Sequence, residues 1–74
     1  MIVSLYTTNS ITHRTVEVET FTELQNLVGG DIQVATQSSS NTVLYSEGGI
    51  PNAFFTSLVG DVVVAPNGWQ DLPK

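Results

Sequence analysis

The chain has 74 residues, of which 41% are apolar, and its seven acidic and two basic residues give a net charge of −5. A chain of this length forms one domain, and without cysteine no disulfide or thiolate metal site stabilises its core. Arg14 and Lys74 are too few for the clustered cations that bind phosphate backbones, which excludes nucleic acid and anionic membranes as partners. The lack of cysteine and of a basic, apolar leader predicts a cytoplasmic protein.

Residues 2–19 predict a β-hairpin. Ile2 to Thr7 is rich in β-branched and aromatic residues with apolar side chains on both faces, which is typical of a central strand. Arg14 to Glu19 alternates strictly between polar and apolar residues, which indicates a second strand with one wet face. The turn-rich segment 7–12 joins the two.

A short helix is predicted next, from Thr20 to Val28. Thr20 and Glu23 have the spacing of a capping box. The helix has one apolar stripe, formed by Phe21, Leu24, Leu27 and Val28. Gly29 follows at the position of a left-handed C-cap.

The second half of the chain predicts three more strands, at 32–36, around 43–45 and at 62–65. The segment 47–52 has turn chemistry, and Asn52 is expected to cap a short helix from Ala53 to Val59 that Gly60 ends. Residues 1–66 thus form a single α+β domain of order ββαββ(short α)β, and residues 67–74 form a short C-terminal tail. The order favours a β-grasp-like fold with a mixed five-stranded sheet, one main helix, and the first and last strands parallel at the centre. A ferredoxin-like fold is the alternative.

One phrase occurs twice: "LVGGDIQV" at 27–34 and "LVGDVVV" at 58–64. It indicates either an internal duplication or a connector that recurs by chance, and the short match favours the connector. We expect both phrases to be turns into strands rather than sites, with Gly29 or Gly30, and Gly60, at positive φ.

No catalytic or cofactor pattern is present. His13, Glu17 and Glu19 share a strand face, but the rise of ~3.3 Å per residue spreads them too far for one metal ion. The serine tract 38–40 lacks a nucleophile elbow, and the Val-Gly-Gly-Asp segment lacks the ending of a phosphate loop. We therefore expect no enzyme, no metal and no cofactor.

Aromatic side chains and strand edges are the candidate contact surfaces. Tyr45, Phe55 and Trp69 are the candidate partner-binding residues, although Trp69 is more simply explained by packing back on the sheet. Of the adjacent Phe54 and Phe55, one is expected in the core and the other at its rim. The second and fourth strands are the expected edges, through which a partner strand or a second copy in a homodimer would pair.

Four short motifs resemble a family of small uncharacterised domains from phages and bacteria: Val28-Gly29-Gly30 after the helix, Glu47-Gly48, Pro51-Asn52, and Gly60 to Val64. The segment between the second and third motifs is shorter here than in the family. The resemblance implies a viral origin, hence the host cytoplasm, and carries over no site residues. Together these features predict a non-enzymatic, phage-encoded protein-interaction module. The alternatives are a small-molecule or metal binder, at the His13–Glu19 face or the turn at 47–52, and a minor virion component.

Overall fold

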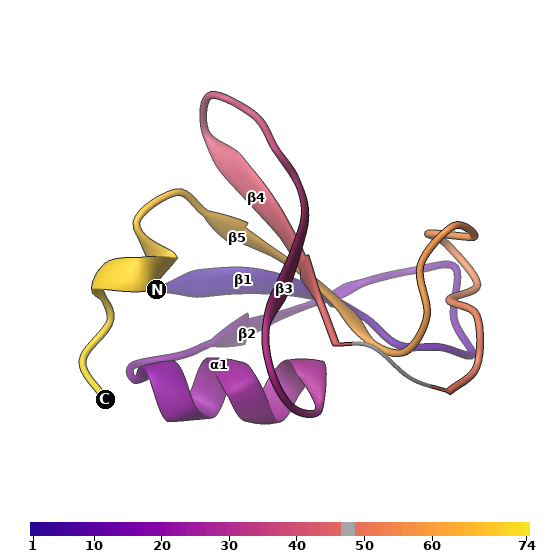
Figure 1. The fold of residues 1–74 in the computed structure, drawn as a ribbon, viewed down its shortest axis with the longest axis horizontal. Coiled ribbons are helices and arrows are strands. Elements are labelled where there is room, and N and C mark those ends of the chain that lie inside the picture. Colours follow the sequence, from indigo (N-terminus) through magenta and orange to yellow (C-terminus); the bar gives the residue numbers. More distant parts are fainter. Residues whose placement is uncertain (47–48) are drawn as a thin grey trace.

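The computed structural model describes residues 1–46 and 49–74, which form one helix and a five-stranded sheet (Figure 1). The elements are, in chain order, β1 (Ile2–Tyr6), β2 (Arg14–Glu17), α1 (Phe21–Val28), β3 (Gln33–Gln37), β4 (Asn41–Tyr45), β5 (Val62–Pro66) and the 3₁₀ helix η1 (Trp69–Asp71). This confirms a small α+β domain. Within the described residues no helix is long and apolar enough to cross a membrane.

The sheet is antiparallel throughout, with the order β2-β1-β5-β4-β3. The predicted hairpin of β1 and β2 is confirmed, and β1 and β5 do lie side by side in the sheet interior. Their predicted parallel pairing is wrong, because Tyr6 at the end of β1 faces Val62 at the start of β5. The mixed, β-grasp-like sheet is therefore wrong. The ferredoxin-like alternative is wrong as well, because it needs a second helix and the described residues between β4 and β5 form none. An evenly apolar sequence predicts that a strand is buried on both faces. It does not predict the direction of the strand, which depends on the end of the sheet at which the preceding loop enters it.

The edges of the sheet are β2 and β3, so the predicted edge role of the fourth strand is wrong. All five residues of β3 are exposed. The pairing of β3 with β4 shifts register between Val34 and Thr36, which is a β-bulge. A bulge bends an edge strand and makes it a poorer template for another strand.

The core lies between α1 and the sheet face that bears Val3 and Leu5. Leu24 and Val28 of the predicted apolar stripe are buried there, and Phe21 and Leu27 pack at its margin. The Thr20 hydroxyl accepts a hydrogen bond from the Glu23 amide (3.1 Å), which confirms the N-cap.

Both glycine turns are confirmed, since φ is 88° at Gly29 and 75° at Gly60. The two phrases nevertheless serve different structures. The first ends α1, whereas the second follows a non-helical loop and leads into β5.

Two segments of the second half differ from the expectation. Residues 53–58 form bends and turns and Val59 forms a single antiparallel bridge with Pro51, so the predicted short helix is wrong. The C-terminal segment 67–74 packs on the domain: Trp69 is 7% exposed within the core, and the Phe21 amide donates to the Pro73 carbonyl (2.7 Å). The expectation that Trp69 packs back is therefore confirmed.

Candidate binding surface at the loop end

The end of the sheet away from the two termini carries two loops, residues 7–13 and 49–61, which lie side by side (Figure 1). We call this region the loop end. Two hydrogen bonds join the loops: the Ala53 amide donates to the Thr8 carbonyl (3.2 Å), and the Thr8 amide donates to Asp61 Oδ1 (3.1 Å). Among the described residues five large apolar side chains are exposed, and three of them belong to these loops, namely Ile11 (72%), Ile50 (64%) and Phe54 (51%).

Four rings form an aromatic cluster at this end: Tyr6, His13, Phe54 and Phe55. The Tyr6 ring is at their centre, with centroid distances of 5.1 Å to His13, 4.8 Å to Phe54 and 4.9 Å to Phe55. Phe54 and Phe55 also meet edge to face at 4.9 Å. These distances are in the range in which aromatic pairs attract each other beyond simple burial. The cluster therefore holds Phe54 in place although half of its surface is in solvent.

The loop that presents Phe54 is organised by Asn52, whose side chain is 1% exposed. Its Nδ2 donates to the carbonyls of Tyr6 and Gly60, both at 2.9 Å. Its Oδ1 accepts from the amides of Phe54 and Phe55, also at 2.9 Å. The two donor and two acceptor positions of the amide are thus all used. The backbone amide of Asn52 also donates to the Leu58 carbonyl (2.9 Å), so the two ends of the segment 52–58 are joined.

Sequence reasoning identified Asn52 as a cap but not its role as the centre of this loop. Asn52 does accept from the second and third amides after it, as an N-cap does, yet no helix follows. The prediction that Phe54 or Phe55 enters the core is wrong, because neither belongs to the buried cluster. The sequence Asn-Ala-Phe-Phe, in which a capping residue precedes two adjacent aromatic residues, was the one local pattern that could have indicated an aromatic pair held at the surface.

The structure places the three predicted partner-binding residues in different surroundings. Phe55 is half-buried within the aromatic cluster. Tyr45 lies on the same sheet face as Tyr6, because both residues are the direct cross-strand partners of Val62, one on each side of β5. Trp69 is apart from them, buried and stacked on Phe21 at 6.4 Å. A partner therefore has access to Phe55 and Tyr45 but finds almost no surface on Trp69.

The alternative sites have little supporting geometry. Among the residues that the structure describes, no group of three or more His, Cys, Asp or Glu side chains is placed to hold a metal ion. The His13 ring packs against Tyr6 and precedes β2, away from Glu19. In the turn at 47–52, Glu47 and Gly48 lie outside the described residues, and Asn52 is used by the loop itself.

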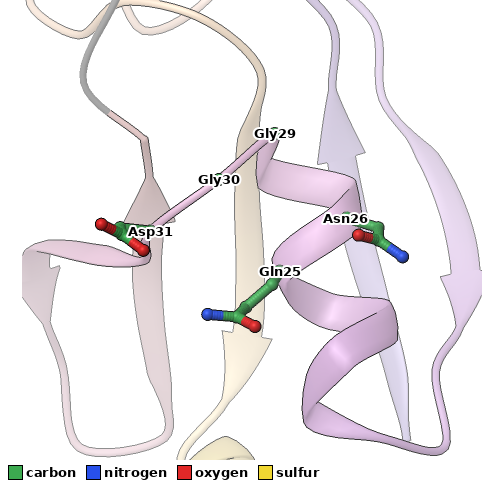
Figure 2. Close-up of a pocket in the computed structure, with 5 residues that line it drawn as sticks. All are labelled: Gln25, Asn26, Gly29, Gly30 and Asp31. Atoms are coloured by element: carbon green, nitrogen blue, oxygen red, sulfur yellow. The ribbon is translucent and has the colours of Figure 1, made fainter.

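A hollow of about 390 Å³ lies at the C-terminal end of α1 and is lined by Gln25, Asn26, Gly29, Gly30 and Asp31. Figure 2 shows that its side chains do not converge, because Asn26 and Asp31 point to opposite sides. The glycines border this hollow, but their positive φ values belong to the turn from α1 to β3. The hollow is therefore a consequence of how the helix ends, because Gly29 and Gly30 have no side chains to fill the space beside it.

Comparisons with protein-family models, with curated proteins and with solved structures find no match to this chain. The resemblance to small phage and bacterial domains therefore stays a prediction, and the loop end has to be interpreted from its own geometry.

Proposed function

We propose that the protein is a non-enzymatic interaction module that binds a protein partner through the loop end. The observation that supports this is that the half-exposed Phe54 is fixed by three neighbours: its ring packs against the rings of Tyr6 and Phe55, and its backbone amide donates to Asn52 Oδ1. A rigid aromatic side chain loses little conformational entropy on binding, which is why aromatic residues dominate the energetics of protein interfaces. The surrounding Ile11 and Ile50 extend the apolar contact area.

The loop end is a better candidate than the sheet edges. The β2 edge carries Arg14 and Glu17, and charged residues on an edge strand oppose pairing with another strand. The β3 edge carries no charge, but it has the bulge at Ala35. A partner strand can be added only to an edge with a regular pattern of backbone hydrogen bonds. Binding through exposed aromatic side chains needs only an apolar surface that is held in place.

Quantitative affinity capture from cells that express the protein tests the proposal. Phe54→Ala removes the exposed ring, and Val34→Ala is a matched control because both parent side chains are 51% exposed. We expect at least one protein to be captured by wild type and by Val34→Ala but lost with Phe54→Ala. Identical captured proteins for all three forms would contradict the proposal, and loss with Val34→Ala alone would favour the β3 edge.

The capture variant has to leave the fold intact. Trp69→Ala is unsuitable for this test, because it removes a core side chain and would confuse unfolding with lost binding. Thermal unfolding of Phe54→Ala before capture separates these two effects.

A further inference from the structure

The sheet has an inner face, which α1 covers, and an outer face on the opposite side. Leu24 and Val28 of α1 belong to the core cluster with Val3, Leu5 and Val63, which defines the inner face. Because successive side chains of a strand point to opposite faces, the residues between these strand positions lie on the outer face. The strand pairings place at its centre Ile2, Ser4, Val43, Val64 and Pro66.

The outer face is mostly apolar along the three inner strands and polar along the two edge strands. An antiparallel strand with one face in water normally alternates apolar and polar residues. In β5 this alternation is missing, since all residues from 62 to 66 are apolar, and on the neighbouring β1 Ile2 is 55% exposed. The edge strands present polar residues to this face: Thr15, Glu17, Gln33 and Thr36. An apolar centre with a polar rim is the composition of a protein interface.

The outer face carries little charge, although the protein has a net charge of −5. Among the side chains that the strand pairings place on this face, Glu17 is the charged one, and it lies at the rim on β2. Two copies of an acidic protein repel each other least where the contact contains almost none of their acidic side chains. A basic partner would instead gain most from the acidic surface elsewhere, so the uncharged face favours a second copy as its occupant.

The area of the outer face determines how tightly two copies can associate. Neighbouring side chains on one face are ~4.8 Å apart across the strands and ~6.8 Å apart along them. Five strands with three such positions each therefore cover roughly 500 Å² per copy, or about 1,000 Å² in a dimer. This is the lower limit for a specific interface, so we expect a dissociation constant on the order of 100 μM.

The two ends of the outer face differ in a way that makes the face complementary to itself. At the loop end Phe54 and Phe55 pack on Tyr6, and the adjacent Val62 is fully buried although it lies outside the core cluster. The other end, which bears Ile2, is open. A two-fold axis that runs across the strands places the covered end of each copy beside the open end of the other.

The same axis also separates the acidic side chains of the two copies. Glu17 pairs with Ile2 at one end of the β1–β2 ladder, whereas the His13 ring packs on Tyr6 at the other end, with centroids 5.1 Å apart. The axis places the two β2 strands over each other in opposite directions. Glu17 of each copy therefore comes towards the histidine of the other copy and not towards its Glu17.

We propose that the protein forms a homodimer in which the outer faces of two copies pack against each other, like the two sheets of a β-sandwich. This goes beyond the proposed function, because the occupant is a second copy and the contact is centred on Ser4 and Val64 instead of on the loops. The side chains of Ile2, Val43 and Pro66 are removed from water in the dimer, which provides the driving force.

Sedimentation equilibrium of the purified protein, from about 10 μM to 1 mM around the expected dissociation constant, tests the proposal. The apparent mass should rise from 8.0 kDa towards twice that value. Ile2→Lys places a charge in the contact and should raise the dissociation constant at least tenfold. Val34→Lys is the matched control, because Val34 is 51% exposed, pairs with Leu44 on the inner face, and gives the same change in net charge. It should leave the dissociation constant within about twofold of the wild-type value.

Methyl chemical shifts of the wild-type protein, recorded over the same concentrations, locate the contact without any substitution. The methyl groups of Val43 and Val64 should shift with concentration, whereas those of Val3 and Leu44, which are buried on the inner face, should not. A monomer at 1 mM, equal effects of the two lysine substitutions, or shifts confined to the edge strands would each overturn the proposal. A monomer would leave the outer face to a foreign partner, and the capture experiment at the loop end would still stand.

Discussion

Asn52→Ala is the substitution that most directly tests how the loop end is built. It removes four hydrogen bonds from a buried side chain, each 2.9 Å long, and leaves the carbonyls of Tyr6 and Gly60 without this donor. A net value of about 1 kcal/mol per bond, reduced because some freed groups reach water, gives a loss of about 3 kcal/mol in the free energy of unfolding. A domain of this size has only about 5 kcal/mol or somewhat more in total, so the variant should lie close to its unfolding threshold.

Urea denaturation followed by the fluorescence of Trp69 measures this loss, because Trp69 is the single tryptophan and is buried. It begins η1, which lies at the end of the molecule away from the loop end (Figure 1). Asn41→Ala is the matched control: Asn41 is exposed, and its side-chain amide makes one recorded bond, to Ser40 Oγ at 3.2 Å. It should change the free energy of unfolding by less than about 0.5 kcal/mol. A loss in Asn52→Ala no larger than that of Asn41→Ala would refute the role assigned to Asn52.

Three further substitutions test the fold, each by thermal and urea unfolding followed by circular dichroism. Trp69→Ala should cost about 3 kcal/mol or more, because it empties a core position against Phe21, and near-normal stability would contradict the docking of the C-terminal segment. Gly29→Ala should cost about 1 kcal/mol from backbone strain alone, since φ is 88° and nothing lies within 4 Å of the new Cβ; a stabilised variant would contradict this. Thr20→Ala should cost about 1 kcal/mol through the lost cap, whereas Thr22→Ala, at an exposed helical position, should cost nothing, and equal effects would count against the cap.

Local signals in the sequence predicted the helix well. The capping box, the apolar stripe and Gly29 all act within one or two turns of chain, and each is present in α1 as expected. The hairpin of β1 and β2 follows from the same kind of local pattern. Sequence reasoning succeeded where the determining contacts are close in the chain.

The sheet topology depended on contacts that are distant in the chain, and there the predictions failed. The direction of β5 is set by the loop 49–61, which returns the chain at the same end where β1 leaves. That loop is held by Asn52 through bonds to Tyr6 and Gly60, 46 and 8 residues away. The capping residue Asn52 and the terminating Gly60 suggested a helix for 53–59, but the buried side-chain bonds of Asn52 stabilise turns instead.

The candidate surface was predictable only in part. Phe55 was among the predicted partner residues, whereas Tyr6 and His13 join it through pairings that no short motif encodes. Trp69 was ambiguous because an aromatic residue near a terminus suits both a core and an interface. Its stacking on Phe21 places it in the core.

The central claim is that the loop end is the partner-binding surface, and site-specific photo-crosslinking in cells tests it most directly. A photoreactive phenylalanine analogue replaces Phe54 in one form and Val34 in the other, two positions with the same exposed fraction of 51% on different parts of the domain. The account predicts a defined protein adduct from position 54 and none from position 34. Adducts from position 34 but not from position 54 would contradict it.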